Sequence, residues 1–184
     1  AAERFGCGFA PTSGKALLQH LTGRGFRRDE LVRAGLVRDS GWDFFQGRLL
    51  WPIRDALGSP LGFGARRLFD DDRMPAKYLN TPETPLYKKS HVLYGLDLAR
   101  QNIGRKNQAV VVEGYTDVMA CHLSGVDTAV ASCGTAFGAE HGRLVQKLMT
   151  GSAMSGEVIF TFDGDAAGQA AALKVFGQDA TFSA

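Results

Sequence analysis

Hydrophobic positions in the second half of the chain come in short, unbroken runs, and each run is followed by a helix-like segment. The runs occupy residues 109–112, 128–132 and 158–162. Apolar residues at consecutive positions are typical of parallel strands covered on both faces. The helical segments follow at residues 117–124, 139–150 and 166–176. Three strand–helix units in series predict an open, right-handed, parallel α/β sheet.

The first half of the chain is less regular and predicts a mixed α+β region. Short helices are expected at residues 12–21, with Thr12 or Ser13 as the N-cap, and at residues 29–34. Two strands, at residues 48–55 and 61–68, flank a Gly-Ser-Pro turn and predict a β-hairpin. The remaining expectations are a solvated loop at residues 70–72, an ordered loop or short strand at 76–89, a helix at 93–103, and a domain boundary at 104–107.

Charge separates the same two halves. Residues 1–107 hold 18 Lys and Arg against 11 Asp and Glu, whereas residues 108–184 hold 3 against 8. The net charge is therefore +7 in the first half and −5 in the second, although the whole chain carries only +2. A basic region suits nucleic acid or polyphosphate, and acidic groups suit divalent cations that bridge to phosphates. The alternative is that these charges only decorate two solvated faces.

Cysteine usage and hydropathy exclude several classes of protein. The three cysteines are far apart and lack the spacing of a structural zinc site or a disulfide framework, so reduced thiols in the cytosol are expected. No apolar run approaches the 18 or so residues that a transmembrane helix needs. The first residues also lack the apolar core of a signal peptide. We expect a cytoplasmic protein that does not bind membranes.

Acidic residues directly follow the first and third predicted strands. Glu113 comes after the run of three valines, and Asp163 and Asp165 come after the strand at 158–162. Because the carboxyl ends of parallel strands meet at one edge of a sheet, these acids should share that edge. Clustered carboxylates there favour Mg²⁺ or Mn²⁺, with substrate phosphates completing the coordination. On the residues alone, either strand end could instead supply a helix cap or a simple turn.

Several segments in the same order resemble one known family. The runs VVVEGYTDVMA, VASCGTAFGAEH and TFDGDAAGQAAALKVF, which begin at residues 110, 130 and 161, resemble the Toprim domain. The runs GRLLWPIRDALGSPLGFGARRL and KYLNTPETPLYKKSHVLYGLDLAR, which begin at residues 47 and 77, resemble bacterial DnaG-type primases in particular. The resemblance implies an α/β RNA polymerase core, with a basic mixed α+β subdomain at 1–107 and a Rossmann-like Toprim subdomain at 108–184.

The resemblance also implies roles for individual residues. Glu113, Asp163 and Asp165 match the Toprim acids that bind metal and act in catalysis, and Asp117 matches a further metal ligand. Basic and polar positions that bind nucleotide or template phosphates in primases are matched by Arg66, Lys77, Asn80 and Lys89. Two positions depart from the family pattern: Phe44 and Gln46 stand where arginines are expected.

The implied function is synthesis of short RNA primers on single-stranded DNA from NTPs, with Mg²⁺ or Mn²⁺, at the replication fork in the nucleoid. One metal is expected near Glu113 and another near Asp163 and Asp165. The resemblance further predicts contact with the replicative helicase through a module outside this chain, and a Toprim subdomain that is incomplete at its C-terminal end. The alternatives are a Toprim nuclease that uses the same acids, and a fragment that binds nucleotide or DNA without turnover.

Overall fold

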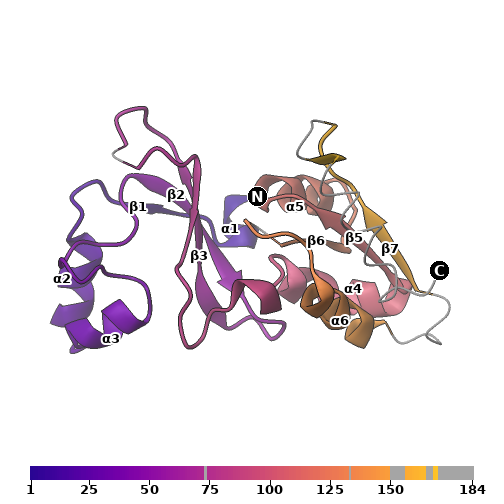
Figure 1. Ribbon diagram of the computed structural model, residues 1–184, viewed down its shortest axis with the longest axis horizontal. Coiled ribbons are helices and arrows are strands. Elements are labelled where there is room, and N and C mark those ends of the chain that lie inside the picture. Colours follow the sequence, from indigo (N-terminus) through magenta and orange to yellow (C-terminus); the bar gives the residue numbers. More distant parts are fainter. Residues whose placement is uncertain (73, 133, 150–155, 165–167, 170–184) are drawn as a thin grey trace. The chain divides into compact units, whose positions relative to one another are not determined.

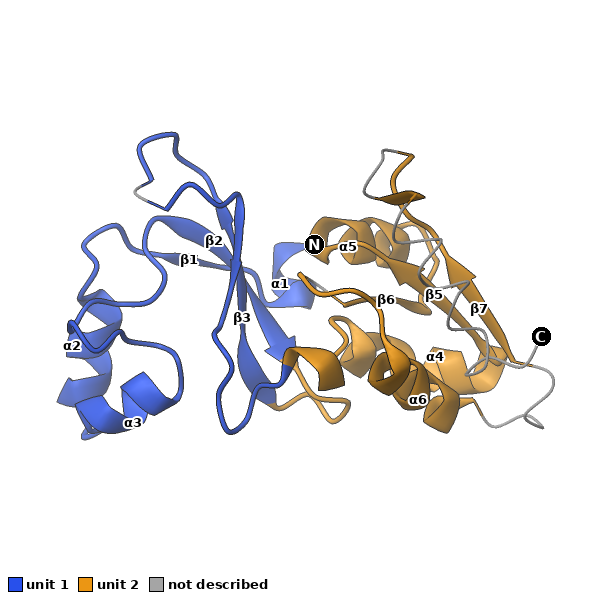
Figure 2. Cartoon of the chain, viewed as in Figure 1, with its two compact units in different colours: residues 1–53, 60–88 blue, residues 54–59, 89–184 orange. Residues whose placement is uncertain are grey.

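The computed structural model describes residues 1–72, 74–132, 134–149, 156–164 and 168–169. Contacts divide the chain into two compact units, which Figure 2 shows in different colours. Unit 1 comprises Ala1–Ile53 and Pro60–Lys88, and unit 2 comprises Arg54–Ser59 and Lys89–Ala184. Each unit has its own sheet and its own buried residues, and each is described by itself.

Unit 1 is built on a four-stranded sheet with the order β1-β2-β3-β4 (Figure 1). The strands are β1 (Gly8–Ala10), β2 (Arg48–Arg54), β3 (Pro60–Arg67) and β4 (Tyr78–Asn80). Strand β1 runs antiparallel to β2, and β4 runs antiparallel to β3. Five residues join β2 to β3, which is far too short for a parallel crossover, so the predicted hairpin is confirmed. The helices are α1 (Ala2–Phe5), α2 (Ala16–Gly23) and α3 (Arg28–Arg33).

Helix α2 begins four residues later than predicted, and neither Thr12 nor Ser13 is its N-cap. The N-cap position is Lys15, whose side chain makes no capping hydrogen bond. Instead, the buried carboxylate of Asp43 accepts the backbone N–H groups of Leu17 and Leu18 at 2.9 and 3.0 Å. These are donors that the first turn of a helix leaves without intrahelical partners. The prediction was wrong because the cap comes from a residue more than 20 positions away in the chain.

Unit 2 contains a three-stranded parallel sheet, as the apolar runs predicted. Strand β5 lies in the middle, in the order β6-β5-β7, and pairs in parallel with both neighbours. The strands are β5 (Gln108–Val112), β6 (Ala129–Ala131) and β7 (Glu157–Phe160). The helical elements are η1 (Lys89–His91), α4 (Leu96–Lys106), α5 (Tyr115–Leu123) and α6 (Ala139–Leu148). The helix predicted at 166–176 falls almost entirely outside the described residues.

The core of unit 2 explains why this unit begins before the predicted boundary at residues 104–107. Helix α4 places Leu96, Ala99 and Ile103 in one buried cluster with Val111 of β5 and Val130 of β6. Each of these side chains is no more than 5% exposed. Burying this apolar surface is favourable, so α4 belongs to the compact unit that contains the parallel sheet. None of the helices in the described ranges is both long and apolar enough to cross a membrane.

Gly95 precedes α4 in a left-handed conformation that only glycine adopts without strain. Its φ is +82°, and a Cβ added there would lie 2.8 Å from Cγ1 of Val118. Gly95→Ala is therefore expected to lower the free energy of unfolding of unit 2 by about 2–4 kcal/mol, from strain and collision together. Gly58→Ala is the matched control, since its φ is +93° with no atom near the added Cβ. Urea denaturation should show a clearly smaller loss for Gly58→Ala, and equal losses would contradict the collision.

Candidate active site

Glu113 and Asp163 lie together at the carboxyl edge of the parallel sheet. Strand β5 ends at Val112 and β7 at Phe160, and the pairing continues beyond β7 because Thr161 N–H donates to Val111 carbonyl oxygen at 2.9 Å. Two residues further along each strand, the backbone N–H of Asp163 donates to Oε1 of Glu113 at 2.8 Å. Both residues are exposed, whereas the strand residues before Glu113 are buried. The sheet therefore presents two acids to solvent at one edge.

The donor set at this edge fits a hard divalent cation. Carboxylate oxygens are the ligands that Mg²⁺ and Mn²⁺ prefer, and Mg²⁺ is commonly held by one or two carboxylates with substrate phosphates and waters completing its shell. Among the described residues, no group of three or more His, Cys, Asp or Glu side chains is close enough to form a protein-only site. A cation bound by Glu113 and Asp163 would keep coordination positions for water or for phosphate oxygens.

Of the other two predicted acidic ligands, the structure describes only Asp117. Asp117 lies in the first turn of α5, and its Oδ2 accepts the N–H of Gly114, the N-cap residue, at 2.9 Å. This carboxylate therefore caps α5, and its negative charge interacts favourably with the positive end of the helix dipole. The ring of Tyr115, which is buried against Tyr94 with ring centroids 4.7 Å apart, anchors the same turn. Asp165 lies outside the described residues, so its place as a ligand stays a prediction.

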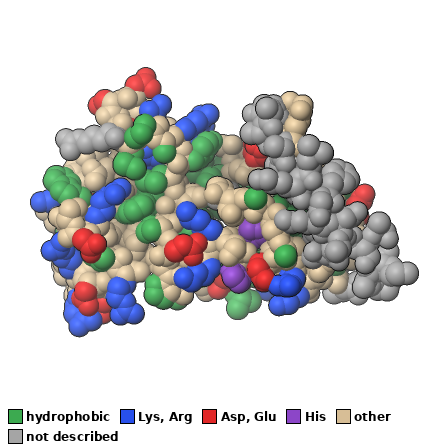
Figure 3. All heavy atoms as spheres, viewed as in Figure 1, with side chains coloured by type: hydrophobic (Ala, Val, Ile, Leu, Met, Phe, Trp, Pro, Cys, Tyr) green, Lys and Arg blue, Asp and Glu red, His purple; other side chains and the backbone are tan. Residues whose placement is uncertain are grey.

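Three of the predicted phosphate-binding residues gather around Tyr78 in unit 1. Arg66 lies directly across from Tyr78 in the β3–β4 pair, with its guanidinium 5.9 Å from the ring centroid. The ammonium of Lys77 lies 5.8 Å from the same ring. Asn80 follows Tyr78 by two positions in β4 and so projects from the same face of the sheet. Figure 3 shows Lys and Arg side chains interleaved with hydrophobic ones over unit 1, a combination that suits single-stranded nucleic acid.

The fourth of these residues, Lys89, begins η1 in unit 2 and is held through its backbone. Its carbonyl oxygen accepts a hydrogen bond from Nε2 of His141, a buried residue in the first turn of α6, at 3.0 Å. Nothing in the sequence spacing connects His141 to a residue 52 positions earlier. The structure adds this link.

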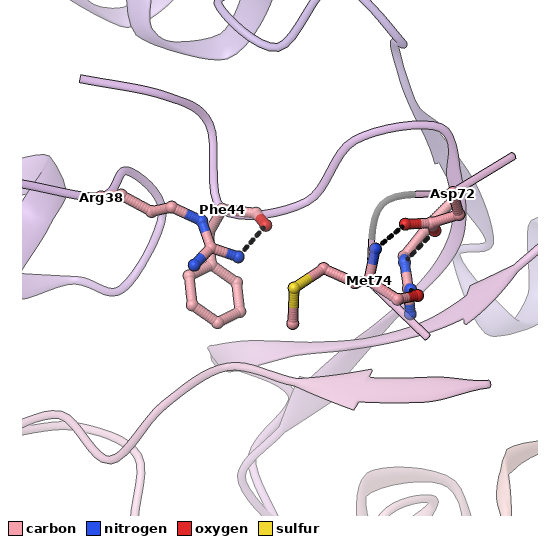
Figure 4. A network of polar contacts seen from close by, with 5 residues as sticks. Arg38, Phe44, Asp72 and Met74 are labelled. Carbon is pink, nitrogen blue, oxygen red and sulfur yellow. Dashed lines mark hydrogen bonds and ion pairs between the residues drawn. The ribbon is translucent and has the colours of Figure 1, made fainter. Parts of the chain in front are cut away.

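Sequence reasoning also missed a buried ion pair in unit 1. Nε of Arg48 lies 2.7 Å from Oδ2 of Asp72, and the two side chains are 2% and 11% exposed. Oδ1 of Asp72 accepts Met74 N–H at 2.8 Å, and Arg48 also donates to Met74 carbonyl oxygen at 2.9 Å (Figure 4). The prediction that residues 70–72 are simply solvated is therefore wrong for Asp72. The pair lines a cavity of about 540 Å³, and its contacts hold Asp72 and Met74 against Arg48 of β2.

The pKa of the Asp72 carboxyl reflects these contacts. Burial tends to raise the pKa, but the hydrogen bond from Met74 N–H and the guanidinium of Arg48 outweigh it and hold the pKa below its ordinary value. Arg38 lines the same cavity, with its guanidinium 4.6 Å from the ring centroid of Phe44. No sequence spacing points to these contacts, because the partners are brought together only by the fold.

Comparison with known proteins assigns both halves of the chain. Residues 1–100 match the family model of the DNA primase catalytic core N-terminal domain, and residues 107–182 match that of the Toprim domain. The DNA primase of Mycobacterium tuberculosis is 61% identical over 180 residues, which are 96% of this chain and 28% of that protein. This chain thus spans little more than a quarter of the length of that relative.

Solved structures of primase domains are similar over nearly the whole chain. The crystal structure of the RNA polymerase domain of Mycobacterium tuberculosis primase DnaG has a TM-score of 0.93 and 58% identity, and the match covers 98% of this chain and 60% of that one. A structure of the DnaG primase catalytic domain bound to single-stranded DNA has a TM-score of 0.82 and 38% identity, covering 97% and 54%. The family of this protein is therefore established: the chain belongs to the DnaG-type DNA primases, with the N-terminal part of the catalytic core joined to a Toprim domain.

Proposed function

We propose that this chain carries the catalytic centre of a primase, which joins ribonucleotides into short RNA primers on a single-stranded DNA template. The observation that carries the proposal is the pairing of Glu113 and Asp163 at the carboxyl edge of the sheet, through the 2.8 Å hydrogen bond from Asp163 N–H. Divalent metal use is implied by the Toprim family. Family membership makes nucleotidyl transfer the chemistry to expect at this edge.

The two carboxylates are proposed to hold a metal shared with the triphosphate of the incoming NTP. Mg²⁺ or Mn²⁺ bound there would neutralise charge on the phosphates and favour ionisation of the attacking 3′-hydroxyl. The backbone N–H of Asp163 holds the Glu113 carboxylate in one orientation, which limits the rotation of this exposed side chain. Asp117 is proposed to support the site by holding the first turn of α5 behind Glu113, and Asp165 is proposed as an additional ligand.

The basic residues are proposed to bind phosphates. Arg66 and Lys77 lie beside an exposed tyrosine ring that can stack on a base, and Asn80 offers an amide on the same face. We infer that these residues hold template or nucleotide, and that Lys89 contacts nucleotide phosphate. The similar structure of a DnaG primase catalytic domain contains bound single-stranded DNA, which supports a template of that kind here. We also propose that the protein acts at the replication fork in the cytoplasmic nucleoid. Contact with the replicative helicase stays a prediction without an assigned residue.

The proposed function is tested by incubating this chain with single-stranded DNA, labelled NTPs and Mg²⁺ or Mn²⁺. Template-dependent RNA products that vanish without metal would support it. Cleavage of the DNA without RNA synthesis would favour the nuclease instead. Binding of NTP or DNA with no product under any metal would mean that these residues form a binding module without turnover.

Removing one phosphate contact should weaken binding to every DNA sequence by a similar factor. For Lys77→Ala we expect the slope of log binding constant against log salt for single-stranded DNA to become shallower by about 0.7, because one fewer counterion is released. Lys15→Ala is a matched control, since Lys15 lies instead against the ring of Trp42 on a different part of unit 1. Fluorescence anisotropy at several salt concentrations measures the slope. An unchanged slope for Lys77→Ala would show that Lys77 does not contact the phosphates of the bound DNA.

A further inference from the structure

His141 makes two hydrogen bonds that require different roles from its two ring nitrogens. Gly138, the N-cap residue of α6, donates its backbone N–H to Nδ1 at 3.1 Å. Nε2 lies 3.0 Å from the carbonyl oxygen of Lys89, which can only accept. The ring must therefore be neutral, with its proton on Nε2. The side chain of His141 thus accepts a hydrogen bond at the start of α6 and donates one to the backbone of Lys89, the first residue of η1.

The surroundings of His141 make this arrangement rigid. The side chain is 1% exposed, and the ring of Phe137 packs against it with centroids 5.5 Å apart. A buried acceptor or donor that loses its partner is costly, so the ring has little freedom to leave either contact. The backbone of Lys89 is consequently held at a defined distance from α6, and the half-buried lysine side chain extends from that fixed point.

We propose that His141 is a positioning residue for nucleotide binding: by holding the carbonyl of Lys89, it sets the direction from which the Lys89 side chain reaches a phosphate. The inference rests on the proposed function, because it takes Lys89 to be a phosphate contact. His141 itself touches no phosphate in this account. Its contribution is to lower the conformational entropy that Lys89 loses when a nucleotide binds.

Substitutions at residue 141 can separate the two hydrogen bonds. His141→Gln offers an amide oxygen to Gly138 N–H and an amide N–H to the Lys89 carbonyl, so it can keep both. His141→Glu can still accept from Gly138, as glutamate commonly does at this capping position, but it has no donor for Lys89. We expect His141→Glu to weaken binding of a fluorescent NTP analogue about 10-fold, and His141→Gln to restore most of that loss.

A double-mutant cycle with Lys89→Ala distinguishes this inference from the proposed function. Suppose that Lys89→Ala weakens NTP binding and that His141→Glu weakens it no further in the Lys89→Ala background. The inference and the proposed function are then both supported, because the two residues act as one unit. Full binding by His141→Glu beside weak binding by Lys89→Ala would overturn the inference and leave the proposed function intact. Full binding by Lys89→Ala would remove Lys89 from the site, and the inference with it.

Protonation of His141 affects its two hydrogen bonds differently. Burial is the main cause that lowers the pKa of His141, assisted by His91 and opposed by the contacts with the Lys89 and Val92 backbones and by Glu140. As the pH falls towards that pKa, Nδ1 gains a proton and can no longer accept Gly138 N–H, whereas Nε2 keeps its proton and still donates to the Lys89 carbonyl. Amide hydrogen exchange at Gly138 should then rise in the wild type but not in His141→Gln, while exchange at residues 89–92 should rise in neither, with exposed His20→Gln as control. A rise at residues 89–92 in the wild type that accompanies the rise at Gly138 would contradict the inference.

Discussion

Glu113→Gln and Asp163→Asn are each expected to lower the rate of RNA synthesis by about 100-fold or more, because charge stabilisation at the reacting phosphate is a leading catalytic contribution. Both substitutions are nearly isosteric. The amide oxygen introduced by Glu113→Gln can still accept Asp163 N–H, and the backbone N–H of residue 163 is retained in Asp163→Asn. The fold of the sheet edge should therefore survive, and the loss should be in the rate and in the metal requirement. A primer-synthesis assay across Mg²⁺ and Mn²⁺ concentrations measures both.

Glu157→Gln is the matched control for these two substitutions. Glu157 begins β7 and lies at the amino end of the same strand, where it pairs with the amide of Gln108 at 2.7 Å. It carries the same charge but sits at the opposite end of the strand from Asp163. Its replacement should leave the rate within about twofold, since a distant exposed charge is strongly screened by salt. Equal losses in all three variants would mean that net charge, and not the carboxyl edge, matters.

Arg48→Ala should destabilise unit 1 by about 3–5 kcal/mol, because it leaves the Asp72 carboxylate without its charged partner in a nearly buried place. Urea unfolding followed by the fluorescence of Trp51 measures this, since Trp51 is 1% exposed and reports on unit 1. The matched control is Asp71→Asn, an exposed neighbour in the same loop, which should cost less than about 0.5 kcal/mol. A loss of that small size for Arg48→Ala would show that the pair is dispensable.

The same ion pair predicts how stability responds to acid. The folded-state pKa of Asp72 lies below its unfolded value. The contribution of the ionised carboxylate to the free energy of unfolding is therefore fully present above about pH 4, and it is lost as the pH falls through the folded-state pKa. In Arg48→Ala the pKa of Asp72 should move upwards, and stability should begin to fall at a higher pH than in the wild type. Thermal melts between about pH 3 and pH 6 would show the difference.

The features that the sequence predicted well are those in which local pattern and tertiary role agree. The valines before Glu113 form a buried central strand, and the parallel sheet follows from that run and from the two others like it. The hairpin of β2 and β3 was predictable because turn residues separate two apolar strands. The edge that carries Glu113 and Asp163 was predictable for the same reason: parallel strands deliver their carboxyl ends to one side.

What the sequence could not reveal depends on contacts between residues that lie far apart in the chain. Asp43 caps α2 from 25 and 26 positions away, and Arg48 reaches across 24 positions to Asp72. The packing of α4 against the parallel sheet could not be read from the sequence either, because only the fold places its buried face there. Strand β1 has too few residues for a visible period, whereas β4 lies in the segment at residues 76–89 that was expected to be an ordered loop or short strand.

The central claim is that Glu113 and Asp163 together hold a divalent cation, and Mn²⁺ binding tests it most directly. The electron paramagnetic resonance signal of free Mn²⁺ would be followed as the chain is added, with and without a non-hydrolysable NTP analogue. The wild type and Glu157→Gln should both bind Mn²⁺, more tightly with the analogue, whereas Glu113→Gln and Asp163→Asn should lose that binding. Equal Mn²⁺ binding by all four proteins would contradict the account and would leave the two acids as parts of a helix cap and a turn.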